Sequence, residues 1–538
     1  MLVLQTGSDD WSRQCQLPDD VQWQFVDINQ PVEDPFIALG RVNVTVIDGT
    51  CPDDILEAIA PHITPHTLLV TEWTRPRGGS VAADVYARKV AHRVDGSNRQ
   101  ELIATIAGSY YVRQFGQKLA VNSILVPPGW TTEPTFVGAT GVTLEVNSPE
   151  SRQAVAWRES IKYEAERDMD LWLEYTTEGD VEVVLTVQHT KAGTSDVILS
   201  HTSHPLKDVT EPILFSSDNN GYLSCSLELQ GSGSITVGPL HYRHSRGKAG
   251  YFFPGGQRLV DSNREEIFHY FHPGNLKPPL TVYFAGYRPA EGFEGNHMME
   301  GLGQPFLLFT DPRLDGGRFY LGSQELEDGI RRVIRDRLES LGFTERDLIV
   351  SGLSMGAFGA LYYGSQFDSH AIIVGKPIID LPYVARQTRL TRPEDFLTVL
   401  DMVNFWKQQT DGQDTTPEGF TEGLISRWKG DIPGKNGLDN TKMLLAYMMH
   451  DDYDNEAYQT LLTSQSGKPT EIIARGYQGR HNDDSPSIVT WFINQYRRVL
   501  GEYQAAHPQP VESEPVASVP RESQPDDAQN TREAVTSE

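Results

Sequence analysis

Residues 347–363 read DLIVSGLSMGAFGALYY: a short apolar run, a turn with the spacing G-x-S-x-G, and a helix of small residues. A strand, a sharp turn and a helix around such a serine are typical of the nucleophile elbow of an α/β-hydrolase. Gly352 and Gly356 remove the side chains that would collide in so tight a turn. Ser354 is then exposed at a helix N-terminus, where unpaired N–H groups and the helix dipole stabilise a developing anion.

A serine nucleophile needs a base, which this fold places in the loop between the last strand and the last helix. Residues 476–484, GYQGRHNDD, lie between an expected strand at 471–475 and a helix that we expect to start at Ser485 and end at Val499. His481 is the only histidine of that loop. We therefore predict that His481 takes the hydroxyl proton of Ser354 and later donates it to the leaving group, rather than being a surface histidine.

The acid of such a triad follows the penultimate strand, which we expect at residues 442–449. The sequence there is His450-Asp451-Asp452-Tyr453-Asp454, so Asp451 and Asp452 both qualify to orient the imidazole. The residues favour Asp451 only slightly, and the other aspartate would then cap the next helix, an ordinary role for Asp. Asp483 and Asp484 are interpreted as loop caps.

An oxyanion hole needs backbone donors near the serine. The N–H of Met355, just after the nucleophile, is one candidate. The second is expected from the loop after the strand that ends at Ala285, where the N–H groups of Gly286 or Tyr287 qualify; a plain turn is the alternative. The segment 311–317, DPRLDGG, either lines the pocket or holds an internal Asp–Arg pair.

The fold class predicted for the 538 residues is α/β. Residues 1–140 alternate strands and helices, whereas 141–250 contain alternating short strands typical of a β-sandwich or jelly roll. Residues 251–503 have the strand–helix alternation of a mostly parallel sheet, here an α/β-hydrolase-like catalytic domain. Its insertion at 384–438 is expected to form a lid or docking surface. Residues 504–538 are rich in Pro, Glu and Ser and are predicted to be a disordered acidic tail.

The β-rich segment suggests a carbohydrate-binding module, because Trp172, Tyr175 and Tyr242 are of the kind that stack on sugars. The alternative, that these aromatics are half-buried sheet residues, is favoured by their place in strands. Residues 178–180, Glu-Gly-Asp, are expected to be a turn between two strands. Histidines of this segment lack acidic neighbours at ligand spacing, so they are interpreted as surface groups rather than metal ligands: His201, His204, His241 and His244.

Composition narrows the function further. An apolar content of 38 % with 22 % charged residues describes a soluble globular chain, and a net charge of −27 argues against binding to nucleic acid. We see neither a signal peptide nor a run long enough to cross a bilayer. The three cysteines, Cys15, Cys51 and Cys225, form neither a disulfide framework nor a metal motif, so the cytoplasm is the expected location and no metal is expected.

Several longer segments resemble one known family, the second accessory-secretory-protein family of the accessory Sec system. The similarity is strong over about residues 240–500 and rests on these segments: LVDSNREE (259–266), HPGNLKPPLTVYFAGYRPAEGFEG (272–295), LLFTDPRLDGGRFYLGS (307–323), SGLSMGAFGALYYG (351–364), AYMMHDDYD (446–454) and GRHNDDSPSIVTWFINQY (479–496). The front half is similar in texture only, and the acidic tail has no counterpart that we can place.

The resemblance implies an intracellular bacterial protein needed to export serine-rich-repeat glycoprotein adhesins. It implies an O-acetyltransferase acting on N-acetylglucosamine of the glycosylated adhesin, with Ser354 and His481 in a Ser–acid–His triad and Asp451 favoured over Asp452. Sibling accessory Sec proteins and the accessory motor ATPase are the implied partners, with peripheral membrane association through the translocase. No bound cofactor is expected; no motif identifies the acetyl donor, for which acetyl-CoA is a candidate. A serine esterase and a non-catalytic export adaptor are the alternatives.

Overall fold

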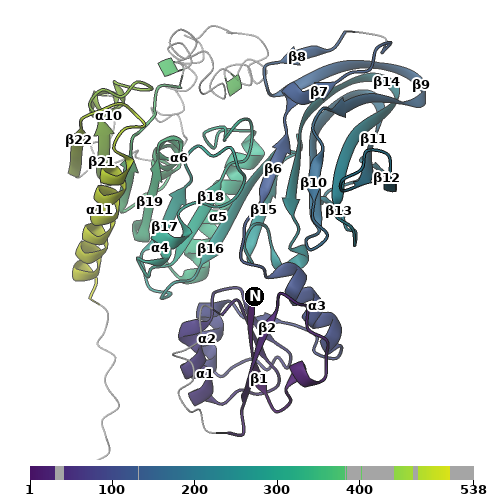
Figure 1. The fold of residues 1–538 in the computed structure, drawn as a ribbon. Coiled ribbons are helices and arrows are strands. Elements are labelled where there is room, and N and C mark those ends of the chain that lie inside the picture. Colours follow the sequence, from purple (N-terminus) through teal and green to yellow (C-terminus); the bar gives the residue numbers. More distant parts are fainter. Residues whose placement is uncertain are drawn as a thin grey trace, which may run out of the picture.

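The computed structural model describes residues 1–30, 42–130, 133–381, 383–384, 401–402, 441–463 and 471–508. Most of the predicted insertion at 384–438, and residues 509–538 of the predicted tail, lie outside the described residues. The described chain forms a mixed α/β structure with three sheets (Figure 1). Among the helices of this part of the chain, none is both long and apolar enough to span a membrane.

The N-terminal module is a five-stranded parallel sheet in the order β2-β1-β3-β4-β5, with helices on both faces. Apolar residues on alternate sides of the strands pack against α1 and α2 on one face and against α3 on the other. The elements are β1 (Leu2–Gly7), β2 (Gln22–Asp27), β3 (Val44–Ile47), α1 (Asp53–Ile59), β4 (Leu68–Val70), α2 (Val81–Lys89), β5 (His92–Arg93) and α3 (Arg99–Ser109).

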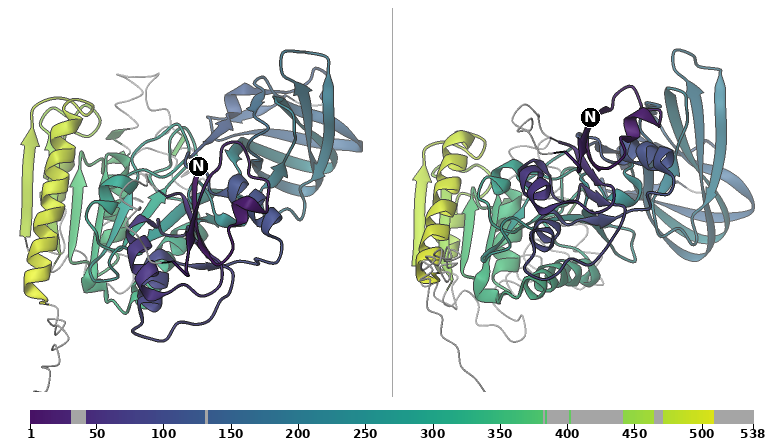
Figure 2. Two further views of the ribbon diagram at one scale, coloured as in Figure 1. Left: turned by 60° about the horizontal axis from the view of Figure 1, so that its bottom comes forward. Right: turned by 90° about the horizontal axis from the view of Figure 1, so that it is seen from below.

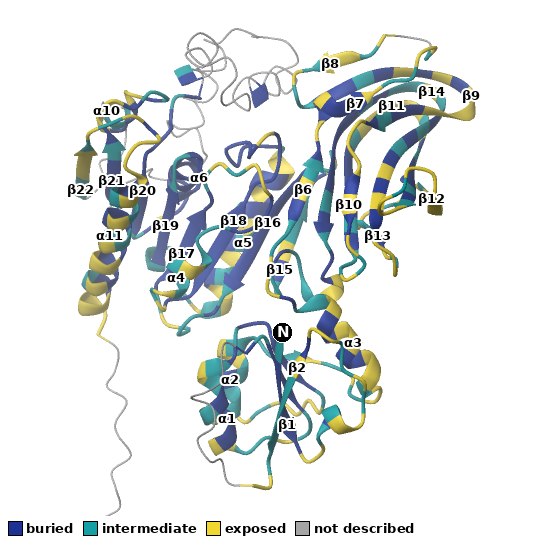
Figure 3. Ribbon diagram, viewed as in Figure 1, coloured by how far each residue is buried: buried dark blue, intermediate teal, exposed yellow. Residues whose placement is uncertain are grey.

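The second module is one continuous nine-stranded sheet with very long, curved strands, and not the two stacked sheets of short strands that the spacing predicts. Alternate buried and exposed residues run along these strands, so one face forms the core (Figure 3). The elements are β6 (Gly116–Leu119), β7 (Ile124–Leu125), β8 (Thr135–Val137), β9 (Gly141–Trp157), β10 (Ile161–Tyr163), β11 (Met169–Lys191), β12 (Ile198–Pro205), β13 (Ile213–Phe215) and β14 (Gly221–His244). Strands β6 to β8 come from residues 116–137, which were predicted to belong to the N-terminal region.

The predicted turn at residues 178–180 is wrong, because these residues continue β11 in antiparallel pairing with β14. Gly179 lies opposite Gly233, and the neighbouring Gly231 lies opposite Val181. A Cβ on Gly231 or Gly233 would lie 2.0 Å from a carbonyl oxygen of β11, and both have positive φ. Glycine therefore lets two long strands bend together at a point where the sequence favours a chain reversal.

The C-terminal module is an eight-stranded sheet in the order β15-β16-β18-β17-β19-β20-β21-β22, parallel from β18 to β22. Its β22 edge lies at the opposite end of the molecule from the curved sheet in every view (Figure 2). The elements are β15 (Gly256–Val260), β16 (Glu266–His272), β17 (Leu280–Phe284), α4 (Asn296–Glu300), β18 (Phe306–Thr310), α5 (Gln324–Leu341), β19 (Leu348–Leu353), α6 (Met355–Gly364), β20 (Ala371–Gly375), β21 (Lys442–Met448), α10 (Ala457–Thr463), β22 (Glu471–Tyr477) and α11 (Ser485–Ala506).

Helices cover both faces of this sheet. Val350 of β19 belongs to the cluster that includes α5 and α6, whereas its neighbour Ile349 belongs to the cluster that includes α4 and α11. Helix α11 runs past its predicted end at Val499, so the first residues of the predicted disordered tail are helical. The reason is Tyr503, which is 2 % exposed and donates its hydroxyl to Asp347.

The interpretation of His241 as a surface group is wrong. His241 lies on β14, is 0 % exposed, and contacts Glu291 Oε1 through Nδ1 at 2.5 Å and Glu174 Oε1 through Nε2 at 2.9 Å. Arg243 donates to Glu291 Oε2 at 2.6 Å. The acidic partners come from β11 and from the loop after β17, which sequence spacing around the histidine cannot reveal. A buried ion network therefore joins the curved sheet to the C-terminal module.

Burial disfavours the imidazolium, but the facing carboxylates of Glu291 and Glu174 outweigh it and raise the pKa of His241 from 6.5 to about 9. Burial also opposes ionisation of Glu291, yet Arg243 and His241 lower its pKa from 4.5 to about 2. The His241 contribution to stability is thus complete below pH 6.5 and is lost as the pH rises through about 9. The Glu291 contribution is complete above pH 4.5 and is lost as the pH falls through about 2.

We predict that Glu291→Gln lowers the unfolding midpoint most between about pH 4.5 and 6.5, where the contributions of both Glu291 and His241 to the free energy of unfolding are present. The difference from the parent should shrink steadily towards pH 9, because the parent loses the ion pair there. Urea unfolding of both proteins at a series of pH values measures it. A difference that stays constant from pH 6 to pH 9 would contradict a charged His241.

Candidate active site

The turn between β19 and α6 has the strained geometry of an elbow. Ser354 adopts φ 55° and ψ −118°, outside the regions that side-chain-bearing residues prefer, and its N–H donates to the Gly375 carbonyl at 2.8 Å. A Cβ on Gly352 would lie 2.1 Å from the Gly356 oxygen, and one on Gly356 would lie 2.0 Å from the Phe284 oxygen. Both glycines are therefore required by close backbone approach.

The parallel order of the sheet gathers the polar residues of the site. Ser354, Lys376, Asp451 and His481 each follow the carboxyl end of a strand, from β19, β20, β21 and β22 in turn. Carboxyl ends of parallel strands meet at one edge of a sheet, where ligands of open α/β sheets bind.

The structure brings Ser354, His481 and Asp451 into one hydrogen-bonded chain, the Ser–His–Asp relay. Ser354 Oγ lies 2.8 Å from His481 Nε2, and His481 Nδ1 lies 2.8 Å from Asp451 Oδ2. The side chains of His481 and Asp451 are 3 % and 4 % exposed, so water screens their interaction little. With a proton on Nδ1 held by the carboxylate, Nε2 faces the serine as an acceptor.

The two neighbouring aspartates have different contacts. Asp451 uses Oδ2 for the imidazole and Oδ1 for the N–H groups of Tyr453 and Asp454, at 2.9 and 3.2 Å. Asp452 accepts the backbone N–H of His481 at 2.9 Å and thus helps to hold the histidine loop. The hydrogen-bond contact with the ring is therefore made by Asp451.

Asp483 and Asp484 lie in the histidine loop as caps. Asp483 accepts the N–H of Arg480 at 3.0 Å. Helix α11 starts at Ser485 as predicted, and Asp484 is its N-cap and accepts the N–H of Ser487 at 3.3 Å. Ser485 contacts Lys376 Nζ at 2.8 Å.

The predicted oxyanion donors are in different situations. Gly286 N–H donates to Glu294 Oε2 at 2.9 Å, so it is already engaged. Its Cα lies beside the carbonyl of Leu353, since a Cβ there would be 3.2 Å from that oxygen. Met355 begins α6, where an N–H has no acceptor within its own helix. Met355 and Tyr287 remain the candidates.

The segment 311–317 contains the internal ion pair that was one of its two predicted roles. Arg313 donates to both oxygens of Asp311, at 2.8 and 2.7 Å, and both side chains are 0 % exposed. The segment nevertheless reaches the elbow, because a Cβ on Gly317 would lie 2.5 Å from the Met355 methyl carbon.

Three residues beside the relay were not predicted as site residues from the sequence. The ring of Tyr453 meets the His481 ring edge-on with centroids 4.6 Å apart. The buried Asp454 accepts the N–H groups of Ile379 and Asp380 and so fixes the loop after β20. Lys376 is buried, and this burial lowers its pKa. Its position directly after a buried strand was a usable signal; the roles of Tyr453 and Asp454 depend on tertiary contacts.

In the described residues, no group of three or more His, Cys, Asp or Glu side chains is arranged to hold a metal ion. The three cysteines are unpaired. In the curved sheet, Trp172 is 2 % exposed under the guanidinium of Arg264, so it presents no face to a sugar.

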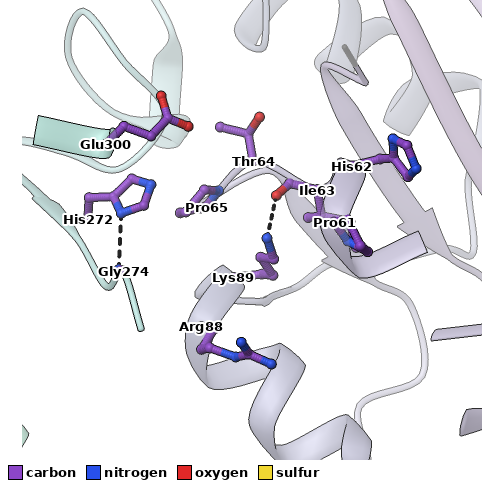
Figure 4. A pocket seen from close by; sticks show the side chains of 10 residues that line it. All are labelled: Pro61, His62, Ile63, Thr64, Pro65, Arg88, Lys89, His272, Gly274 and Glu300. Atoms are coloured by element: carbon purple, nitrogen blue, oxygen red, sulfur yellow. Dashed lines mark hydrogen bonds between the residues drawn. The ribbon is translucent and has the colours of Figure 1, made fainter. Parts of the chain in front are cut away.

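A cavity of about 360 Å³ lies between the N-terminal module and the end of β16 (Figure 4). His272, which lines it, pairs with Phe306 at the start of β18, whereas Ser354 follows the end of the parallel β19. The cavity is therefore at the opposite edge of the sheet from the relay. Its charged and imidazole lining comes from His62, Arg88, Lys89, His272 and Glu300.

Similarity to known proteins extends over nearly the whole chain. The family model described as accessory Sec system GspB-transporter matches residues 1–505. The chain belongs to this family. Accessory secretory protein 2 of Streptococcus gordonii is 36 % identical over 506 residues, which cover 93 % of this chain and 97 % of that protein. The Staphylococcus aureus (strain NCTC 8325 / PS 47) protein is 34 % identical over 517 residues, 93 % of this chain and 96 % of that one.

A solved structure agrees with this membership and confirms the family predicted from the sequence. A chain of the Glycosylation Associate Protein (Gap123) complex from Streptococcus agalactiae matches with a TM-score of 0.83 and 32 % identity. The match covers 93 % of this chain and 98 % of that one. The similarity therefore includes all three sheets and not the serine-bearing module alone.

The elbow predicts a steric effect of one methyl group. Gly356→Ala should destabilise the protein by about 3 kcal/mol, because the new Cβ meets a backbone carbonyl that has little freedom to move. Gly108→Ala, in α3 with nothing within 4 Å of the added Cβ, is the matched control and should stay within about 1 kcal/mol of the parent. Denaturant unfolding of both variants measures this; equal stabilities would contradict the close approach at the elbow.

Proposed function

We propose that this protein is an acyltransferase in which Ser354 is the nucleophile, His481 the general base and acid, and Asp451 the orienting carboxylate, on a catalytic module of α/β-hydrolase type. The observation that carries the proposal is the chain of two 2.8 Å contacts from the Ser354 hydroxyl through His481 to Asp451. A serine hydroxyl is a weak nucleophile, and an imidazole held in this way activates it.

The geometry supports the following sequence of steps. Ser354 Oγ attacks the acyl carbonyl while His481 Nε2 takes its proton, and the resulting oxyanion is stabilised by the N–H of Met355 and one from the loop after β17. Collapse expels the leaving group, which takes the proton from His481 and leaves acyl-Ser354. An acceptor hydroxyl then attacks the acyl carbon, gives its proton to His481, and the proton returns to Ser354.

As substrate we propose N-acetylglucosamine on serine-rich-repeat glycoprotein adhesins, O-acetylated with a donor of the acetyl-CoA type. Membership of the accessory Sec system GspB-transporter family supports this, because a protein dedicated to the export of another protein has that secreted protein at hand as a substrate. The similar Streptococcus agalactiae chain belongs to a complex of glycosylation-associated proteins. We propose corresponding partners here: sibling accessory Sec proteins and the accessory motor ATPase, in the cytoplasm.

A serine esterase is the second candidate, and the same relay favours it. Transfer and hydrolysis share the acyl-Ser354 intermediate and differ in whether a sugar hydroxyl or water reaches it. An activated acetyl ester, supplied with and without an N-acetylglucosamine acceptor, separates the two. Turnover that yields only free acetate in the presence of the acceptor favours the esterase. Family membership also favours an export-adaptor role, which can coexist with catalysis.

The choice between the two aspartates gives a sharp test. Asp451→Asn should lower kcat by about 10⁴-fold, because the amide no longer holds His481 in the productive tautomer. Asp452→Asn retains an oxygen that can accept the His481 N–H and should keep most of the activity. Turnover of an activated acetyl ester by both variants checks the assignment; the reverse order of effects would transfer the role to Asp452.

In cells, Ser354→Ala should remove the acetyl groups from the adhesin sugars, as read by mass spectrometry of the exported glycoprotein. Ser365→Ala, at the other end of α6, loses only a local hydrogen bond to the Tyr362 carbonyl and should leave acetylation intact. Acetylation that persists at the parental level in Ser354→Ala would refute the proposed nucleophile. Adhesin secretion in the same strain shows whether export depends on catalysis.

A further inference from the structure

We propose that His241 and Glu291 are positioning residues for acyl transfer: their buried ion pair lets the curved sheet hold the loop on the oxyanion side of Ser354. The inference rests on the proposed function. It assigns a role in turnover to the second module, which contributes no residue to the relay.

The loop in question, residues 285–295, connects β17 to α4 and passes the elbow. Gly286, at its start, packs beside the carbonyl of Leu353, the residue before the nucleophile. Gly292 and Gly295 have φ values of 140° and 81°, so the loop includes positions with wide conformational freedom. A loop of this kind needs contacts from outside itself to keep its N–H groups in one place.

The curved sheet supplies these contacts through Glu291. One carboxylate oxygen lies 2.5 Å from His241 Nδ1 and the other 2.6 Å from Arg243 Nε, both on β14. The backbone N–H of Glu291 donates to the Gly116 carbonyl on β6 at 2.9 Å. Gln114 adds a further pair by accepting the Phe293 N–H at 2.7 Å and donating to the Phe293 carbonyl at 3.2 Å.

A second arm reaches the neighbouring loop. Lys118 on β6 donates to the carbonyls of Pro312 and Leu314. That loop continues to Gly317, which packs on Met355, the residue that follows the nucleophile. The two loops are also tied to each other, because the Arg288 N–H donates to the Gly316 carbonyl at 3.2 Å.

Because the charges of His241 and Glu291 are buried, their contact fixes the position of the loop 285–295. The Glu291 side chain is 1 % exposed and that of His241 0 %, so separating the two inside the protein would leave a buried charge without compensation, at a large cost in free energy. The carboxylate therefore has one favoured position, and the loop backbone follows it. Catalysis by oxyanion donors depends on such fixed geometry, since a displacement of about 1 Å costs roughly 10²-fold in rate.

The test uses the full chain and burst kinetics with an activated acetyl ester. His241→Gln should slow the acylation burst by about 10²-fold, while the burst amplitude, which counts competent serines, and KM stay near the parental values. The matched control is His189→Gln on β11. His189 is also 0 % exposed, and neither of its ring nitrogens has a hydrogen-bond partner in the described part of the chain. The control should keep the parental burst rate.

Glu291→Gln provides a milder second variant, because the amide keeps an oxygen near His241 but loses the charge; its burst rate should lie between those of the parent and His241→Gln. A parental burst rate in both variants, or a loss of amplitude without a change in rate, would overturn the positioning role. If neither variant folds, the pair is a folding element and the inference fails. Parental turnover of the activated ester by Ser354→Ala would instead refute the proposed acyl-serine chemistry, so the two failures are distinguishable.

Discussion

The close approach of α6 to the end of β17 is the constraint on which the site depends. Only because Gly356 has no side chain can its backbone sit against the Phe284 carbonyl, at a spacing where a Cβ would be 2.0 Å away. That approach forces the turn, and the turn holds Ser354 at a positive φ with its hydroxyl 2.8 Å from His481 Nε2. The cost of the strained residue is offset by the fully buried helix that follows it.

Parallel strand order then does the rest of the assembly. Each residue of the relay follows a strand end, so residues separated by up to 127 positions meet without any of them needing a long side chain. On the other side of the serine, the buried ion network holds the loop after β17. It links β11, β14 and the loop after β17 through the buried contacts of His241 with Glu174 and Glu291.

Much of the relay was predictable from the sequence, because its residues occupy positions fixed by chain order. G-x-S-x-G after an apolar run, and one histidine in the loop before the last helix, leave little freedom of assignment. The residues alone favoured Asp451 over Asp452 only slightly, since both occupy the right loop and side-chain direction separates them. The environment of His241 was not predictable, because its carboxylate partners Glu174 and Glu291 are 67 and 50 positions away.

The curved sheet shows a second limit. Turn residues such as Gly179 indicate a change of direction locally, but whether the chain reverses or merely bends depends on what lies opposite. Here Gly233 lies opposite and permits a bend, so strands of 23 and 24 residues replace the short strands expected. Helix α11 was likewise extended by a tertiary contact, that of Tyr503 with Asp347.

The central claim, that Ser354 carries the acyl group, is tested most directly by mass spectrometry of the protein quenched in acid during turnover of an activated acetyl donor. The account predicts one added acetyl group, located on the peptide that contains Ser354. Turnover with no adduct on that peptide, or with the acetyl group on another residue, would contradict it.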